Sequence, residues 1–188
     1  DFAVVATGPA GLTLDGQEDS DSYAVQLGSL LGPVVINDTG TSGVDSLLIN
    51  GTPGDDVIIL TDGGVDFGSE DVTFSGIEQF EVHAGDGNDV VDGSALTTPV
   101  TIFGGNGNDR LTGGSADDFL YGENGDDDLI GNLGADYLDG GAGSDAIVGD
   151  QGVIGPHELL DGSTETTLAI PSGKLEALVN RAGTVRRV

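Results

Sequence analysis

Hydrophobic positions in the first hundred residues fall in short apolar and β-branched runs, with turn-forming Gly, Asp, Thr and Ser between them. The runs recur at a spacing of roughly ten to fifteen residues, which is typical of short strands. They lie at Ala3–Val5, Tyr23–Leu27, Val34–Ile36, Leu47–Ile49, Val57–Leu60, Val72–Phe74, Phe80–Val82 and Val100–Phe103. Strands of this kind build either a sandwich or the wide coils of a β-solenoid, and the spacing alone does not separate the two.

A nonapeptide repeat replaces this pattern from Gly104 onward. Five copies follow one another without a gap through residue 148, namely GGNGNDRLT, GGSADDFLY, GENGDDDLI, GNLGADYLD and GGAGSDAIV. A sixth copy carries Ile154 where the others carry aspartate, and two detached copies lie at 51–59 and 84–92. Because such a repeat buries its apolar face only against a neighbouring coil, the detached copies favour wide solenoid coils in the N-terminal half.

The positions of the nonapeptide differ in what they tolerate. Position 8 is always a branched aliphatic residue and position 7 is unrestricted, so each copy contains a short strand with one buried face. Positions 1 to 5 are mostly small or polar, which is typical of a tight turn. Position 6 is aspartate in all five copies: Asp109, Asp118, Asp127, Asp136 and Asp145. Two copies make one coil, so Asp109, Asp127 and Asp145 are predicted to form one column and Asp118 and Asp136 another, with coils about 4.8 Å apart.

The chain is strongly acidic, with 33 Asp and Glu against 5 Lys and Arg in 188 residues and a formal net charge of −28. This charge excludes nucleic-acid binding by counterion release, and the chain has no apolar run of the roughly 18–20 residues needed for membrane insertion. The absence of cysteine excludes disulfides and thiolate metal sites.

The predicted aspartate columns need a cation. Stacked carboxylates repel one another by roughly 1 kcal/mol per pair even at high dielectric, and Arg110 is the only basic residue before Lys174. Carboxylates together with turn carbonyls make an all-oxygen ligand set. Such a set suits calcium, which accepts about 6–8 flexible ligands, better than magnesium, which requires a strict octahedron.

The nonapeptide resembles the G-G-x-G-x-D-x-U-x pattern of RTX, or hemolysin-type, calcium-binding repeats. The resemblance is strong over 104–148 and looser at 51–59 and 84–92. It implies a right-handed parallel β-roll in which several calcium ions lie between stacked turns, held by position-6 aspartates and turn carbonyls. The ligands that it implies are Asp109, Asp118, Asp127, Asp136 and Asp145, Asp89 and Asp56 of the detached copies, the position-1 glycines Gly104, Gly113, Gly122, Gly131 and Gly140, and the position-3 residues Asn106 and Asn124.

Some residues depart from the repeat pattern or lie outside it. Glu123 and Asn132 replace the second glycine, and Ile154 removes the last carboxylate, so the column that ends at Asp136 is expected to bind its terminal ion weakly. The side chains at turn position 5 are expected only to shape the turn: Asn108, Asp117 and Asp126. Scattered aspartates are expected to form a solvated face: Asp15, Asp45 and Asp62.

These observations predict an all-β fold in four segments. Residues 1–50 form a β-rich segment with wide coils or a sandwich-like arrangement, and 51–103 an irregular solenoid that includes the detached repeats. Residues 104–155 form the tandem calcium-binding β-roll, and 156–188 a cap and tail. In this tail Ser172 is placed to cap a short helix through Asn180, which would close the open end of the last coil.

No catalytic motif is complete. His157-Glu158 begins like a zinc-protease motif, but Asp161 stands at the position of the second histidine. Phe119 and Tyr137 both occupy position 7, two copies apart, and are expected to stack on the outer face as sheet packing rather than as a sugar platform.

The sequence therefore favours a non-enzymatic, calcium-dependent extracellular segment of a bacterial surface, adhesin, surface-layer or fibre protein. Its expected partners are calcium, copies of itself, and cell-surface or matrix molecules. One alternative is the C-terminal secretion and folding module of an enzyme exported by a type I system, of the protease or lipase kind. A third reading, less favoured, is a carbohydrate-active β-helix enzyme.

Overall fold

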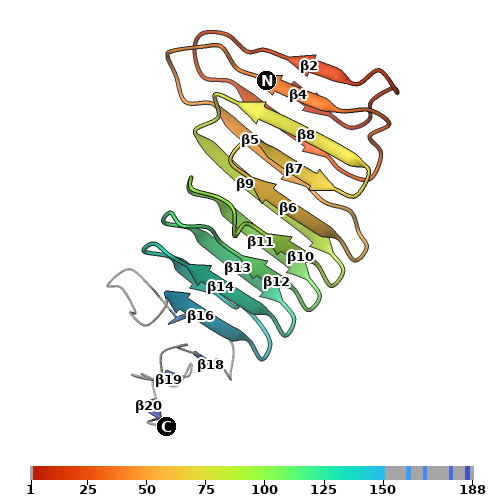
Figure 1. The fold of residues 1–188 in the computed structure, drawn as a ribbon. Helices are drawn as coiled ribbons and strands as arrows, with labels where there is room; N and C mark the ends of the chain where they lie inside the picture. The colour runs from red at the N-terminus through yellow and green to blue at the C-terminus, as the bar shows by residue number, and fades with distance from the viewer. Residues whose placement is uncertain (1, 151–159, 162–166, 169–177, 180–184, 187–188) are drawn as a thin grey trace.

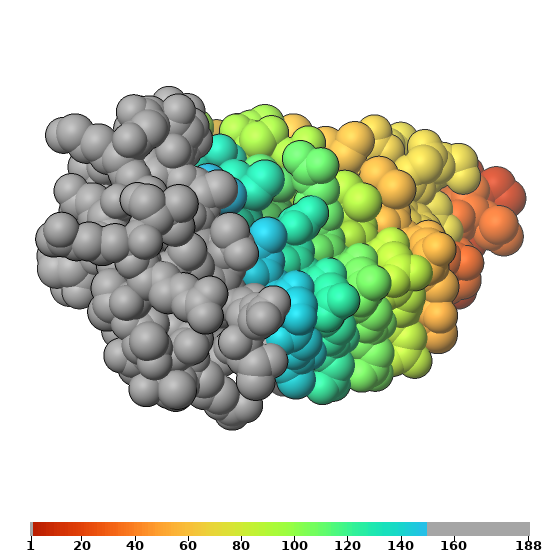
Figure 2. Space-filling view, turned by 90° about the horizontal axis from the view of Figure 1, so that it is seen from below, coloured from red at the N-terminus to blue at the C-terminus, as the bar shows by residue number. Residues whose placement is uncertain are grey.

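The computed structural model is a parallel β-solenoid of about 7 turns, and it describes residues 2–150 with the short strands 160–161, 167–168, 178–179 and 185–186 (Figure 1). Successive coils stack in sequence order, visible as bands from orange to blue in Figure 2. The predicted all-β solenoid is thus confirmed, and the described residues contain no helix. The predicted helix over 172–180 lies outside them, except for residues 178–179, which form a strand.

The first sheet has eight parallel strands in the order β1-β3-β5-β9-β11-β13-β15-β17. Their bounds are β1 Phe2–Val4, β3 Ser22–Gln26, β5 Ser46–Asn50, β9 Gln79–Asp86, β11 Thr101–Asn106, β13 Phe119–Asn124, β15 Tyr137–Asp139 and β17 Leu160–Asp161.

The second sheet has ten strands in the order β18-β16-β14-β12-β10-β6-β7-β8-β4-β2. Their bounds are β18 Thr167–Leu168, β16 Ala146–Asp150, β14 Asp128–Asn132, β12 Arg110–Thr112, β10 Val90–Asp92, β6 Val57–Thr61, β7 Gly64–Phe67, β8 Glu70–Ser75, β4 Val34–Asn37 and β2 Leu12–Leu14. Two further strands, β19 Leu178–Val179 and β20 Val185–Arg186, pair antiparallel with each other.

The core consists of apolar columns that run along the solenoid between the two sheets. Parallel pairing places Leu111 beside Leu129 in the second sheet and Leu120 beside Leu138 in the first. All four of these position-8 side chains are at most 1% exposed. Complete burial of such a side chain contributes about 1.5–3 kcal/mol, so the strand half of each nonapeptide holds the coils together.

The coils of the N-terminal half are wider than those of the repeat array. Equivalent residues are 18 apart in the array, as for Asp109 and Asp127, but 24 apart between Ser22 and Ser46. Part of the extra length lies in the turn between β4 and β5, where the Thr39 hydroxyl donates to Asp15 at 3.0 Å in the preceding coil. The structure therefore confirms wide coils rather than a sandwich.

An antiparallel insertion adds strands to the second sheet but none to the first. Strands β6, β7 and β8 follow one another antiparallel, so three strands lie between β4 and β10 while β5 and β9 are direct neighbours in the first sheet. The sequence pattern predicts β6 and β8 but not β7, because Gly64–Phe67 contains only two apolar residues. At the start of β8, the buried Glu70 carboxylate accepts from the backbone N–H groups of Gly28 at 2.8 Å and Leu30 at 2.9 Å.

Candidate metal centre

One edge of the solenoid carries a long column of position-6 aspartates, which runs from Asp56 through Asp89, Asp109 and Asp127 to Asp145. Each residue sits in the turn that leads from the first sheet to the second. The backbone N–H of each aspartate donates to Oδ1 of the aspartate in the next coil, at 2.7 Å from Asp109 to Asp127 and 3.0 Å from Asp127 to Asp145. The detached copies continue the same ladder, at 2.8 Å from Asp56 to Asp89 and 2.9 Å from Asp89 to Asp109.

The opposite edge carries a shorter column. The Asp118 N–H donates to Oδ1 of Asp136 at 3.0 Å, and the Val100 N–H donates to Oδ1 of Asp118 at 3.0 Å. Val100 stands where the next aspartate of this column would lie, because the insertion 93–103 interrupts the repeat. The 18-residue coil thus places Asp118 and Asp136 in a column of their own, as the repeat predicts.

The first aspartate of each column accepts hydrogen bonds at both carboxylate oxygens, in part from its own turn. Asp56 accepts from the Thr52 backbone N–H at 2.6 Å and from the Thr52 hydroxyl at 2.7 Å. Oδ2 of Asp118 accepts from the Gly114 N–H at 2.6 Å. These two carboxylates therefore have hydrogen-bond donors within the protein at both oxygens.

The inner members of the long column keep one buried oxygen each without a donor. Oδ2 of Asp89, Asp109 and Asp127 has no hydrogen-bond partner, although these residues are only 1–2% exposed. Leaving such an acceptor unsatisfied in a buried site costs about 1–3 kcal/mol, and more when the group is charged. An oxygen-binding cation would remove this cost at all three positions.

The position-1 glycines make room for these oxygens. A Cβ at Gly104 would overlap Oδ2 of Asp109, and a Cβ at Gly122 would overlap Oδ2 of Asp127. The same relation holds for Gly113, Gly131 and Gly140 with the aspartates of their own turns. Glycine at this position is thus required by the carboxylate of the same turn.

The family model of the RTX calcium-binding nonapeptide repeat matches the chain in four copies, over residues 81–95, 101–129 and 121–153. No curated protein matches the chain significantly. Residues 81–95 and 101–153 carry RTX calcium-binding repeats. These repeats bind calcium, and they are typical of secreted bacterial proteins. The matched residues include Asp89 and all five consecutive copies, whereas the copy at 51–59 lies outside the match.

The other polar positions of the RTX turns lie away from the buried column. At position 3, Asn106 Nδ2 donates to Asp86 at 2.6 Å and Asn124 Nδ2 donates to Asn106 at 3.0 Å, in an exposed ladder on the surface of the turns. At position 5, Asp126 accepts from the Ser144 N–H at 2.8 Å, and Asp117 accepts from the Ala135 N–H at 2.8 Å. The position-5 side chains therefore link turns of successive coils on the exposed surface, rather than only shaping their own turn as the sequence predicted.

Burial perturbs the acidity of the RTX aspartates. It raises the pKa of Asp127 to about 7 and that of Asp89 to about 6, and neighbouring carboxylates in the column add to both shifts. Burial also raises the pKa of Asp109 and of Asp118. In the metal-free fold, burial therefore makes the charged form of these carboxylates less favourable than in an exposed aspartate.

Acidification is expected to stabilise the metal-free chain. The folded pKa values lie above the ordinary value of 3.8, so between about pH 4 and 7 the folded chain binds protons that the unfolded chain does not. The free energy of unfolding in chelator should consequently rise as the pH falls from 7 to 5. Far-ultraviolet circular dichroism in chelator checks this by the β-structure gained as the pH falls, and a β-signal that decreases over that interval would contradict it.

A further acidic group lies outside the RTX array, on the turns that lead from the second sheet to the first. Carboxylate oxygens of Asp21, Asp38 and Asp45 lie within 4.8 Å of one another. Asp45 is only 5% exposed, so the expectation that it belongs to a solvated face is wrong. Sequence reasoning missed this group because its members come from two connections without a repeat: Asp21 lies between β2 and β3, and Asp38 and Asp45 lie between β4 and β5. The Tyr23 hydroxyl donates to Asp38 at 2.6 Å, and its burial and this neighbour raise the pKa of Tyr23.

A row of rings follows the outer face of the first sheet. His83, Phe103 and Tyr121 succeed one another at 4.7 and 4.8 Å between ring centroids, and Tyr137 follows at 5.4 Å. The predicted contact of Phe119 with Tyr137 is confirmed, at 6.1 Å. Phe103 and Tyr121 lie nearly parallel, at 8°, so their facing surfaces cover each other and are not open to a sugar ring.

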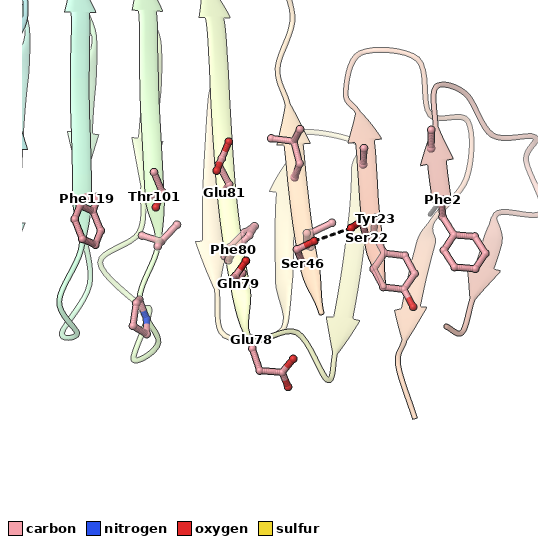
Figure 3. A pocket seen from close by; sticks show the side chains of 16 residues that line it. Phe2, Ser22, Tyr23, Ser46, Glu78, Gln79, Phe80, Glu81, Thr101 and Phe119 are labelled. Atoms are coloured by element: carbon pink, nitrogen blue, oxygen red, sulfur yellow. Dashed lines mark hydrogen bonds between the residues drawn. The ribbon is translucent and has the colours of Figure 1, made fainter. Parts of the chain in front are cut away.

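A groove of about 720 Å³ crosses the first residues of strands β1, β3, β5, β9, β11 and β13. Figure 3 shows Phe2, Tyr23, Phe80 and Phe119 along it, on strands β1, β3, β9 and β13. Its charged lining residues are Glu78 and Glu81, so the groove has no positive charge to offer an anionic ligand. Within the described residues, no helix is long and apolar enough to cross a membrane.

Proposed function

We propose that this chain is a calcium-dependent, extracellular structural segment of a bacterial surface or matrix protein, such as an adhesin, a surface-layer protein or a fibre component. The observation that carries the proposal is the long aspartate column. It extends beyond the consecutive repeats into the N-terminal half, where Asp56 and Asp89 continue it. Calcium binding in the RTX array would therefore act on the coils of both halves.

The oxygens present along the column fit calcium. Asp89, Asp109 and Asp127 each offer one buried carboxylate oxygen that lacks a donor, beside the backbone of a tight turn. Carboxylate and carbonyl oxygens are the ligands that calcium prefers. We assign these three aspartates as principal ligands, with Asp145 closing the column, Asp136 serving the short column, and the position-1 glycine carbonyls contributing. Asp56 and Asp118, whose oxygens already have donors, would mainly hold their turns in place.

A non-catalytic role is supported by the arrangement of the charged groups. His83 lies on the surface, where its ring contacts the Glu81 carboxylate at 2.6 Å. The buried position-6 carboxylates lie in two columns that run along the solenoid, and none of them lines the groove across the first sheet. This arrangement favours an extended ion-bound scaffold. The reading as an export module of an enzyme predicts a catalytic domain encoded upstream of Asp1, which the full gene sequence would test.

Calcium-dependent self-association is expected at the N-terminal coil. Strands β1 and β2 are the outermost described strands of their sheets, so each has one unpaired edge. Val5 is 69% exposed beside β1, and unpaired strand edges invite pairing with another chain. Calcium also neutralises charge that otherwise keeps copies apart. Light scattering after size exclusion should therefore show a higher mass in calcium than in chelator.

A pair of charge-matched variants isolates the contact. Ala3→Lys adds a lysine to the exposed face of β1, where lysine blocks edge pairing, and Ser94→Lys adds the same charge on an exposed turn. Only Ala3→Lys should return the chain to a monomer in calcium. A wild-type chain that stays monomeric at millimolar calcium would remove self-association from the proposal and leave a segment that works as a single stalk.

A further inference from the structure

The chain contains three Asn-Gly dipeptides. Asn50–Gly51 lies at the end of β5, outside the consecutive repeats, and the other two lie in the turns of the long column. They are Asn106–Gly107 and Asn124–Gly125, at turn positions 3 and 4 of the RTX repeats. In an Asn-Gly pair the glycine nitrogen can attack the side-chain amide carbon with little hindrance, because glycine carries no side chain. A carbon–nitrogen bond closes a succinimide ring and ammonia leaves. Water then opens the ring, at either carbonyl, to aspartate or isoaspartate.

The fold itself requires glycine at the reactive position. Gly107 and Gly125 have φ angles of +128° and +138°, which L-residues with side chains rarely adopt. A Cβ at Gly107 would also overlap the carbonyl oxygen of Gly87, and a Cβ at Gly125 that of Gly107. The turns cannot exchange these glycines for bulkier residues that would slow the attack.

The folded turns hold the attacking nitrogens in hydrogen bonds. The Gly107 N–H donates to the carbonyl oxygen of Asn124 at 2.8 Å, and the Gly125 N–H donates to that of Ala142 at 2.8 Å. The amides under attack are held as well, since Asn106 Nδ2 donates to Asp86 at 2.6 Å and Asn124 Nδ2 to Asn106 at 3.0 Å. Ring closure therefore requires each turn to detach from its neighbour first.

We propose that Asn106 and Asn124 are deamidation sites that calcium protects, and that their modification permanently removes the ability of the array to refold on calcium. The inference rests on the proposed calcium-dependent folding. Isoaspartate lengthens the turn backbone by one methylene, which displaces Gly107 or Gly125 from its hydrogen bond. At Asn106 it also replaces the donor to Asp86 with a second carboxylate, which repels it. A chain left without calcium would thus lose its function irreversibly with time.

The test follows deamidation in the full chain, incubated in calcium and in chelator at the same warm temperature and mildly alkaline pH. Peptide mass mapping should show loss of Asn106 and Asn124 about ten-fold faster or more in chelator, which corresponds to about 1.4 kcal/mol of local stability supplied by calcium. Asn132 is the internal control. It belongs to the same array and donates to the Gly113 carbonyl at 2.7 Å, but Leu133 follows it, so it should persist in both conditions.

A double variant tests the consequence. Asn106→Gln with Asn124→Gln keeps both amides, but ring closure from glutamine needs a larger ring and is slow. Circular dichroism should first show that this variant folds in calcium like the wild type. After incubation in chelator, the variant should recover its folded spectrum on addition of calcium, while the wild type should recover only in part.

The outcomes separate this inference from the proposed function. Circular dichroism that shows the unmodified chain equally folded in chelator and in calcium would overturn calcium-dependent folding, and this inference with it. A calcium-dependent spectrum together with equal rates of Asn106 and Asn124 loss in both conditions would overturn the protection alone. Equal recovery of the aged wild type and the double variant would overturn the permanent loss of refolding.

Discussion

Removal of calcium is expected to unfold most of the chain. In the long column, the buried carboxylates of Asp89, Asp109 and Asp127 each leave one oxygen unsatisfied. At about 1 mM calcium and a site constant near 0.1 mM, each occupied site adds about 1.4 kcal/mol. Three such sites add roughly 4 kcal/mol, a large part of the 5–15 kcal/mol that typically stabilises a domain. Far-ultraviolet circular dichroism should therefore show little β-structure in chelator and recovery on addition of calcium.

Two controls separate ion binding from simple screening of the net charge of −28. Sodium chloride at matched ionic strength screens exposed charges but does not occupy an oxygen cage, so it should restore little structure. Magnesium at the same concentration should also restore little, because it retains its water and demands strict octahedral geometry. A spectrum that stays folded in chelator, without any added divalent ion, would contradict the expected dependence.

The repeat array could be predicted because the nonapeptide determines both where each strand lies and which residues of successive coils pair. Position 8 predicts the buried columns of Leu111 and Leu120, and two copies per coil predict which aspartates stack. The spacing of 18 residues also predicts which side chains other than the aspartates lie side by side. Phe103 and Tyr121 are 18 apart, as Phe119 and Tyr137 are, so the same periodicity could have predicted the longer ring row.

The irregular part depends on contacts that no local pattern encodes. Strand β7 has two apolar residues and is held by pairing with β6 on one side and β8 on the other. The group of Asp21, Asp38 and Asp45 forms because the wide coils bring the connection between β2 and β3 beside the one between β4 and β5. The coil width follows from turn length rather than composition. Burial of Asp45 is therefore a tertiary property, and its sequence neighbours Val44 and Ser46 give no sign of it.

Substitution of a single inner aspartate should have opposite effects with and without calcium. Asp127 lies in the middle of the long column, where its Oδ1 accepts from the Asp109 N–H and its Oδ2 has no donor. Asp127→Asn keeps an oxygen for the Asp109 N–H but removes the charge. In calcium, loss of one to two sites should cost about 1.4–3 kcal/mol and lower the calcium stoichiometry. Chemical unfolding in saturating calcium and calorimetric titration measure these two quantities.

In chelator the same substitution should stabilise the chain, because it removes a buried charge that its fold disfavours, as the raised pKa of Asp127 shows. Asp126→Asn is the matched control. It makes the same chemical change one residue earlier in the same turn, on an exposed side chain whose oxygen accepts from the Ser144 N–H. That variant should change the calcium midpoint and the stability in chelator by no more than about 0.5 kcal/mol, as expected of surface substitutions. If Asp127→Asn lowers stability in calcium and raises it in chelator while Asp126→Asn changes neither, Asp127 is an ion ligand in the column. Equal effects of the two variants would mean that position 6 serves the turn and not the ion.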